Sequence, residues 1–383
     1  MGASPLPVQA ARATARAAAV NPLTARGMWI WNLSASSGGS VRLIVSWARE
    51  HGVGTLFVKA GDGSSLWSQF SPGLVAALHA NGLRVCAWQY VYGNYPVAEA
   101  DVGAAAVRAG ADCLAIDAET EYQGKYISAQ TYLSQLRRLV GSGYPLVLAG
   151  LPYVDYHPGF PYSVFLGPGG AQYNAPQMYW VDIGTSVDRV YTHTYAYNRL
   201  FGRRIFPLGQ VYNHPAPGQI IRFRQESRSY SAPNVSWWDW QEASPSAWRA
   251  VALPAGPITD FAASTALAVI GPRAKGDLVV WAQQHLVNAG YAIPVDGDFR
   301  AETLAAVTAF QAAHGLTIDG LVGPATWQAL LRYGAARITW TRAGATVARA
   351  AGGALVLRVP KSASLPATRD EIPGSHGAGG QPR

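Results

Sequence analysis

Cysteine is scarce in this chain of 383 residues, which contains only Cys86 and Cys113. Two cysteines cannot build the disulfide framework that supports a small secreted domain. Both lie in apolar runs, LRVCAW and ADCLAI, that are typical of buried strands. We therefore expect two buried free thiols, and a single bridge is the alternative.

Charge is scarce as well, at 14% of the residues, whereas hydrophobic residues make up 49%. This balance excludes a disordered chain and indicates a folded protein with a large core. The net charge of +8 suits an anionic partner such as an anionic cell wall, but the basic residues are scattered and form no Lys/Arg run interleaved with aromatics. We therefore expect no nucleic-acid binding.

Motifs of several protein classes are absent. No apolar run reaches the ~18 residues of a membrane-spanning helix, so we expect no transmembrane segment. The histidines show no metal-ligand spacing, and the motifs H-E-x-x-H, G-x-S-x-G and G-x-G-x-x-G do not occur. The sequence therefore predicts no metal site, no cofactor, and neither zinc-amidase nor serine-hydrolase chemistry.

The first 26 residues are rich in Ala and Arg and lack the compact apolar centre of a secretory signal. Two interpretations of residues 1–26 stay open. They are either the small-residue end of a signal that starts upstream of Met1, or a disordered leader.

Between residues 27 and 255, short β-like runs alternate with amphipathic helical stretches. The runs cover residues 28–32, 55–60, 84–91, 113–119, 145–150, 175–180, 205–212 and 235–240. Helix-start signals between them include Ser40, Ser71-Pro72 and Ser128. Such alternation favours a parallel sheet, and this number of units predicts an α/β fold of the closed (β/α)8 TIM-barrel type. A doubly wound open sheet is the alternative.

Residues 272–333 differ in character and follow a Pro/Ala-rich link. They contain three short amphipathic helical segments closed by Gly, and the turns Asp296-Gly297 and Asp319-Gly320 precede the later two. This pattern predicts a small three-helix all-α module. Residues 334–383 are expected to form a tail with two strands followed by a disordered end.

The module resembles the bacterial peptidoglycan-binding domain of the three-helix type. Matching positions include Gln283, Asp296-Gly297, Phe299, Gln311, Asp319-Gly320 and Thr326-Trp327. One departure is Arg300, because the family usually has Gly after the Phe. The resemblance implies that peptidoglycan or a related wall glycan is the partner, and that the protein is extracellular or associated with the cell wall. A degenerate packing module is the alternative. We expect a monomer.

The stretch Cys113–Tyr122 reads CLAIDAETEY and places Asp117, Glu119 and Glu121 two residues apart. Alternate residues of a strand share one face, so Asp117 and Glu119 should point into the barrel at the carboxyl end of its fourth strand, where barrel active sites lie. Paired carboxylates suit glycoside hydrolysis, in which one group donates a proton and the other stays ionised. Their repulsion should raise at least one pKa. A solvated position just past the strand is the alternative for Glu121.

The other strand ends carry aromatic, amide and charged side chains, which suit the apolar faces and polar edges of sugar rings. The expected substrate-binding residues are Trp29, Trp31, Lys59, Asp62, Gln89, Tyr90, Gln177, Tyr179, Gln210, Tyr212, Trp238, Asp239 and Trp240. Two of them have simpler interpretations, since Lys59 could only neutralise the carboxylates and Asp239 could cap a loop.

The barrel is similar to the clan of carbohydrate-active barrels that includes family 25 muramidases and family 18 chitinases. The D-x-E motif of residues 117–119 carries the resemblance, together with Q-M-Y-W at 177–180 and W-Q at 240–241. It implies Glu119 as the general acid. It also implies Asp117 as a stabiliser, or as the group that orients a substrate N-acetyl arm which itself attacks.

One departure concerns the first strand, where family 25 muramidases carry an acidic residue and this chain has Trp31 and Asn32. Two functions therefore stay open. The preferred one is a cell-wall glycoside hydrolase of the peptidoglycan-hydrolase type, and the alternative is a non-catalytic, lectin-like wall protein.

Overall fold

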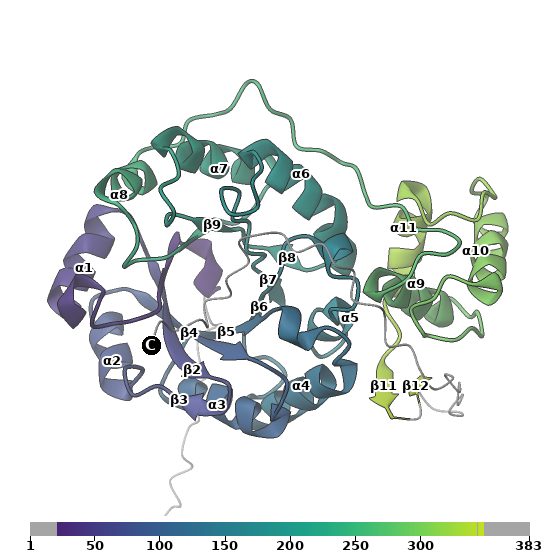
Figure 1. Cartoon of the computed structure of the whole chain (residues 1–383), viewed down its shortest axis with the longest axis horizontal. Coiled ribbons are helices and arrows are strands. Elements are labelled where there is room, and N and C mark those ends of the chain that lie inside the picture. The colour runs from purple at the N-terminus through teal and green to yellow at the C-terminus, as the bar shows by residue number, and fades with distance from the viewer. Residues whose placement is uncertain (1–20, 343, 348–383) are drawn as a thin grey trace, which may run out of the picture.

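The computed structural model describes residues 21–342 and 344–347, and the larger part of it is a barrel of strands inside a ring of helices (Figure 1). The strands follow the spatial order β8-β7-β6-β5-β4-β2-β1-β10-β9, with β3 paired to β2. Their bounds are β1 Gly27–Ile30, β2 Thr55–Asp62, β3 Ser65–Leu66, β4 Arg84–Val91, β5 Cys113–Ala118, β6 Leu146–Ala149, β7 Tyr173–Asn174, β8 Arg204–Ile205, β9 Leu208–Gln210 and β10 Ser236–Trp238.

The barrel is closed. The two short strands β8 and β9 follow one another along the chain and occupy one strand position, and Gln177, just past β7, forms a parallel bridge with Leu208 of β9. Every pairing around the ring is parallel. The predicted (β/α)8 TIM-type fold is therefore confirmed.

The sixth and seventh strand positions are less regular than the sequence pattern predicted. The runs 175–180 and 205–212 were expected as strands, whereas the structure has the short segments β7, β8 and β9. Pro176 follows β7 closely and Pro207 separates β8 from β9. Because proline has no backbone N–H, each interrupts the ladder of hydrogen bonds.

The ring of helices comprises α1 Val41–Glu50, α2 Pro72–His79, α3 Pro96–Arg108, α4 Tyr126–Val140, α5 Tyr162–Phe165, α6 Val187–Asn198, α7 Pro217–Ser229 and α8 Pro245–Ala252. Ser40 and Ser71 act as predicted, because their hydroxyl oxygens accept the backbone N–H groups of Leu43 and Leu74 at the first turns of α1 and α2. Helix α4 begins two residues before Ser128, the predicted start signal.

The apolar core has two layers, which the alternation of each strand separates. Along β5, Cys113 and Ala115 face the barrel interior, whereas Leu114 and Ile116 pack with the surrounding helices. The interior layer is aromatic, and the ring of Trp29 stacks on that of Phe57 with 4.7 Å between centroids. The predicted inward direction of the acidic positions follows from the same alternation.

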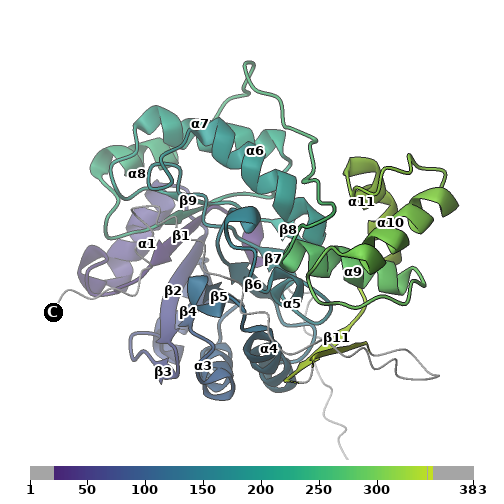
Figure 2. The same ribbon diagram turned by 45° about the vertical axis from the view of Figure 1, so that its right-hand side comes forward.

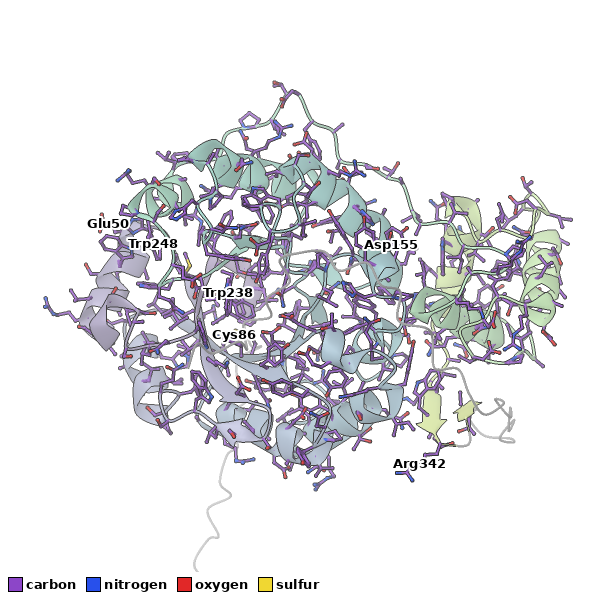
Figure 3. The ribbon with its side chains drawn as sticks, in the orientation of Figure 1. Glu50, Cys86, Asp155, Trp238, Trp248 and Arg342 are labelled. Atoms are coloured by element: carbon purple, nitrogen blue, oxygen red, sulfur yellow. A yellow bond between two sulfur atoms is a disulfide. The ribbon has the colours of Figure 1, made fainter. Side chains whose placement is uncertain are left out.

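The two cysteines form a disulfide, so the prediction of free thiols is wrong. Cys86 of β4 and Cys113 of β5 are directly opposite in the parallel ladder, with 4.6 Å between Cα atoms. Both side chains face the barrel interior, and Figure 3 shows Cys86 near the middle of the ring. The register between the strands brings the two sulfur atoms together, and neither cysteine's own sequence context contains that information.

The segment just before β1 closes the amino-terminal end of the barrel. It forms a short 3-10 helix, η1 (Pro22–Thr24), in which Leu23 is fully buried among the interior residues. The Thr55 hydroxyl at the start of β2 donates to the Pro22 carbonyl at 2.7 Å. Residues 21–26 of the expected leader thus belong to the barrel, and residues 1–20 lie outside the described part of the chain.

The small module contains α9 Asp277–Asn288, α10 Ala301–Ala313 and α11 Pro324–Leu330. Two buried glutamines hold its two Asp-Gly turns. The Gln283 amide oxygen accepts the N–H groups of Asp296 and Gly297, each at 2.9 Å, and the Gln311 amide oxygen accepts the N–H of Gly320 at 3.0 Å. These matching positions of the predicted domain are therefore structural.

The module packs directly against the barrel, with α9 beside α5 (Figure 2). The buried Asp277 carboxylate accepts the backbone N–H and the hydroxyl of Ser163 at 2.7 and 2.5 Å. The Trp281 indole donates to the Leu200 carbonyl at 2.7 Å. Because these contacts are buried and directional, the module is held in one orientation against the barrel.

The tail continues as a hairpin of β11 (Ile338–Thr341) and β12 (Gly344–Val347). The Trp340 ring packs on Tyr126 of α4 with 4.5 Å between centroids, and the Gln130 amide bonds both the N–H and the carbonyl of Trp340. The remainder of the expected tail, residues 348–383, lies outside the described residues. Within the described residues, none of the helices has the length and apolar character needed to cross a bilayer.

Candidate active site

Two carboxyl groups meet at the carboxyl end of β5. The Gln177 amide nitrogen, reaching across from the end of β7, donates to Asp117 Oδ1 at 2.9 Å and to Glu119 Oε1 at 3.0 Å. Both acidic side chains are almost fully buried. One amide group from a distant part of the sequence therefore holds the pair, and no cation is bonded to either carboxylate within the described residues.

Burial raises the pKa of both acids. The pKa of Asp117 lies well above its usual range because of burial and the charge of Glu119, against the opposing effect of Lys59. Burial raises the pKa of Glu119 to about 7, while its hydrogen bonds to Gln177 and Asp117 act in the opposite direction. The pair therefore retains a proton near neutral pH, as an acid catalyst requires.

Glu121 lies at the rim of the same mouth and is exposed. Its carboxylate accepts the Tyr90 hydroxyl at 2.9 Å, and Tyr90 is the direct neighbour of Asp117 in the β4–β5 ladder. The third acid of the predicted cluster is thus close to the other two but stands in a more solvated position.

Lys59 is buried at the mouth end of β2. Its ammonium group bonds Asp62 at 2.7 Å and lies over the rings of Trp67 and Trp88, at 4.3 and 4.9 Å from their centroids. The Tyr92 hydroxyl completes the group by donating to the second oxygen of Asp62 at 2.8 Å. The positive charge therefore has one dedicated carboxylate partner and acts on the acid pair only through space.

The opposite wall of the mouth is aromatic. The rings of Tyr179 and Tyr212 meet edge to face with 5.5 Å between centroids, and the Tyr212 hydroxyl donates to Asp182. Burial and the neighbouring charges, among them Asp117, raise the pKa of Tyr179, so its hydroxyl stays protonated. The half-buried Trp31 adds an indole N–H that is buried and has no partner among the described residues.

Asp239 is a further buried acid, directly after β10. Its Oδ1 accepts the N–H of Glu242 at 3.3 Å, which fits the predicted loop cap, while its Oδ2 has no partner among the described residues. Burial raises the pKa of Asp239 to about 8, with a smaller contribution from Glu242. It acts on Tyr179 through space, as the acid pair does.

Four predicted substrate-binding residues have side chains that are not available to a ligand at the mouth. Trp29 lies deep in the barrel interior, where its indole N–H donates to Ser236 at 3.1 Å. Gln89 faces the helices, and its amide nitrogen donates to the Gly63 and Glu99 carbonyls, each at 2.8 Å. Trp240 packs against Trp248 of α8, which Figure 3 labels on the outer side.

Gln210, the fourth, lies at the mouth end of β9 but is fully buried. Its amide oxygen accepts the Val181 N–H at 2.7 Å and its nitrogen donates to the Tyr212 carbonyl at 3.3 Å. It therefore supports loops and has no free group for a ligand. Trp238, in contrast, is the last residue of β10 and packs on Trp88 at the mouth end of the interior layer. Figure 3 shows it near the middle of the ring.

Sequence reasoning missed three residues of the mouth, namely Trp67, Tyr92 and Asp182. Tyr92 directly follows β4, one residue beyond the predicted run 84–91, so the strand pattern did indicate its position. Trp67 directly follows β3, and Asp182 lies in the connection between β7 and α6. Nothing in the strand pattern marked these two. No three His, Cys, Asp or Glu side chains are arranged to hold a metal ion in residues 21–342 and 344–347.

Comparison with known families concerns the small module first. Residues 275–330 match the family model described as "Putative peptidoglycan binding domain". The chain carries a peptidoglycan-binding domain. In this domain, Arg300 has φ −99°, a conformation open to any residue, so the family's glycine is not required there. Arg300 instead bonds Asp296 and Asp298 at 2.8 and 3.2 Å.

Among curated proteins, the chain is similar to the N-acetylmuramoyl-L-alanine amidase CwlL of Bacillus licheniformis, with 39% identity over 70 residues. The match covers 18% of this chain and 19% of the amidase, so the chain spans about a fifth of that relative's length. A peptidoglycan-binding protein from Clostridioides difficile is 41% identical over 16% of this chain and 40% of that chain, with a TM-score of 0.16. A GH18 chitinase from Pseudoalteromonas aurantia covers 58% of this chain and 97% of its own at 13% identity, with a TM-score of 0.43.

Proposed function

We propose that the protein is a cell-wall glycoside hydrolase. Its peptidoglycan-binding domain holds the protein on the wall, and Asp117 and Glu119 hydrolyse a glycosidic bond of the wall glycan. The supporting observation is the buried acid pair, which shares the Gln177 amide and retains a proton near neutral pH. No cation of the described residues forms an ion pair with Asp117 or Glu119, so a structural ion pair does not explain why the two acids are buried together.

The roles divide as follows. Glu119 donates its proton to the glycosidic oxygen as the bond to the sugar carbon breaks, and Asp117 stabilises the positive charge that develops on the ring. A water then adds to that carbon and returns a proton to Glu119, which completes the hydrolysis. Both carboxyl oxygens lie within hydrogen-bond reach of one nitrogen, so they are closer together than the ~6.5–9.5 Å that inverting enzymes use to hold a water between two acids. This favours a second role for Asp117, which is to orient an N-acetyl arm of the substrate for attack.

The walls of the mouth suit a sugar chain. Tyr179 and Tyr212 offer aromatic faces, and the half-buried Trp31 adds a third ring. Glu121 and Asp62 at the rim are already bonded by Tyr90 and Lys59, so the rim keeps its shape before a ligand binds.

Two observations support a location outside the cytoplasm. The peptidoglycan-binding domain points to the wall, and the disulfide between Cys86 and Cys113 is of the kind that persists in oxidising environments.

A lectin-like protein without catalysis is the second candidate, and the end of β1 favours it. Asn32 replaces the acid of family 25 muramidases, and its side-chain oxygen accepts the N–H and hydroxyl of Ser34 at 3.0 and 2.7 Å. This strand therefore adds no acid to the pair. In that case the mouth would bind wall glycan without cleaving it.

Digestion of purified cell walls separates the two. The full chain should sediment with the walls and release muropeptides with new reducing ends, which mass analysis detects. The Glu119→Gln variant should still sediment but release nothing. Sedimentation of the wild type without any release would instead establish the lectin-like function.

A further inference from the structure

A second cluster of charged side chains lies at the end of the barrel opposite the acid pair. A cavity of about 240 Å³ opens there, lined by Arg26, Arg224, Ser227, Arg228, Ala232, Pro233, Asn234 and Val235. Arg26 and Val235 directly precede β1 and β10, and the α7 residues come from the last turns of that helix. Both features mark the amino-terminal end of the barrel, and we call this site the arginine cavity.

The three arginines of the cavity come from two elements and each is anchored by one nitrogen. Arg26 donates through Nη1 to the His51 carbonyl at 2.7 Å, Arg224 through Nη1 to the carbonyls at the end of α8, and Arg228 through Nη1 to the Ala255 carbonyl. Within the described residues, no hydrogen bond uses Nε or Nη2 of any of the three. Arg26 Nε is buried and without a partner.

The positive charge of the cavity has no carboxylate to balance it. No Asp or Glu is among the lining residues. Burial and then the charges of Arg26 and Arg228 lower the pKa of Arg224 to about 10, and burial and then Arg228 lower that of Arg26. Anchoring of the chain at the ends of α1 and α8 explains the Nη1 bonds. It does not explain why three guanidinium groups gather around one cavity, because each additional positive charge adds repulsion.

We propose that the arginine cavity binds a phosphate group, either free or as a phosphate ester. The fork of a guanidinium group matches two phosphate oxygens. Among the described residues, Arg228 has both Nε and Nη2 unbonded for that contact, and Arg26 has Nη2. A phosphate monoester carries nearly two negative charges at neutral pH and so offsets more of the cluster than a carboxylate does. Since a water takes up about 30 Å³ of liquid, the cavity has room for phosphate and part of the group that bears it.

Calorimetric titration of the full chain in a chloride buffer at neutral pH tests the proposal. One arm uses inorganic phosphate and the other poly(glycerol phosphate), so that a free anion and a phosphate-bearing polymer are distinguished. The variants are Arg228→Gln and Arg26→Gln, and the control is Arg108→Gln, which removes the same charge from an exposed position at the end of α3.

We expect saturable binding of at least one probe, weakened about tenfold or more by Arg228→Gln and by Arg26→Gln and unchanged by Arg108→Gln, because each lost guanidinium removes charge-assisted hydrogen bonds. Circular dichroism establishes which variants are folded, and a folded variant of either cavity arginine suffices for the comparison. Absence of binding in both arms would overturn the proposal. So would wild-type affinity in a folded cavity variant, or equal weakening by Arg108→Gln.

Discussion

The mouth of the barrel and the core of the peptidoglycan-binding domain both contain aspartates held by a glutamine amide. In the domain, Gln283 Nε2 bonds Asp296 Oδ1 at 2.9 Å, and Arg300 bonds the other oxygen of the same aspartate. At the mouth, the Gln177 nitrogen is divided between Asp117 and Glu119, and no cation of the described residues joins them. The same polar group therefore serves two different arrangements.

The difference separates a structural network from a candidate catalytic one. Around Gln283 the donors and acceptors are matched, which is the condition under which a buried polar network stabilises a fold. Around Gln177 there is more negative charge than the donors can stabilise, so the acids keep a proton. A surplus of one charge in a buried site is a cost to folding, which is why the acid pair is a candidate for function.

The largest expected effect is on the hydrolysis of wall glycan, and it tests whether the acid pair differs from the structural network around Gln283. Glu119→Gln keeps the shape of the side chain but removes the transferable proton, so hydrolysis of wall glycan should fall by about 10²–10⁴-fold. Release of reducing ends from purified walls measures it. Glu121→Gln serves as the matched control because Glu121 stands at the exposed rim, and it should lose far less. Equal losses in both variants would remove the special role of Glu119.

A second prediction concerns the matched network. Gln283→Ala should lower the free energy of unfolding by about 2–4 kcal/mol, because it leaves the buried N–H groups of Asp296 and Gly297 without acceptors. Urea denaturation followed by fluorescence measures the loss. A change below about 0.5 kcal/mol would mean that these groups find other partners, and the network would not hold the domain together.

A third prediction concerns stability against pH. The pKa of Glu119 is raised in the folded state to about 7, so its contribution to stability is present at acidic pH and is lost as pH rises through that value. Glu119→Gln mimics the protonated form. It should therefore be more stable than the wild type at pH 8 by about 1–3 kcal/mol and similar to it at pH 4. Thermal unfolding at the two pH values provides the test, and equal stability at pH 8 would argue against a buried, proton-retaining Glu119.

The smallest effect is expected at Arg300. This side chain is more than half exposed, at 55%, and its ion pairs with Asp296 and Asp298 are screened by water. Arg300→Gly restores the residue usual in the family and should change the free energy of unfolding by less than about 1 kcal/mol. Urea denaturation at low and high salt checks this, and a loss of several kcal/mol would make the ion pairs essential to the domain.

The sequence pattern predicted the barrel because strand runs and helix signals alternate regularly, and it predicted the direction of Asp117 because period two holds along β5. The same period could have excluded Gln89, whose neighbour Tyr90 faces the interior. Pairing of the two cysteines required the register between β4 and β5, which local sequence does not contain.

Contacts between distant segments account for most of what was missed. Gln177 was predicted as a substrate-binding residue, but its contact with the two acids, 58 and 60 residues away in sequence, was not predicted. The docking of the small module was not foreseen either. It depends on Asp277 meeting Ser163, which are 114 residues apart. Such contacts depend on how whole elements pack, so local patterns do not reveal them.

The acid pair itself is tested most directly by NMR titration of the side-chain carboxyl carbons of Asp117 and Glu119, assigned with the Asp117→Asn and Glu119→Gln variants. We predict two separated steps for the pair, with the step of Glu119 near pH 7 and that of Asp117 raised well above the usual range, since burial opposes the loss of each proton and the charge of Glu119 opposes that of Asp117. In Glu119→Gln, the step of Asp117 should move to lower pH because the repelling charge of Glu119 is gone. Two independent steps near the ~3.9 and ~4.3 of free Asp and Glu would contradict the account, because the carboxylates would then stand in open water with no proton to donate.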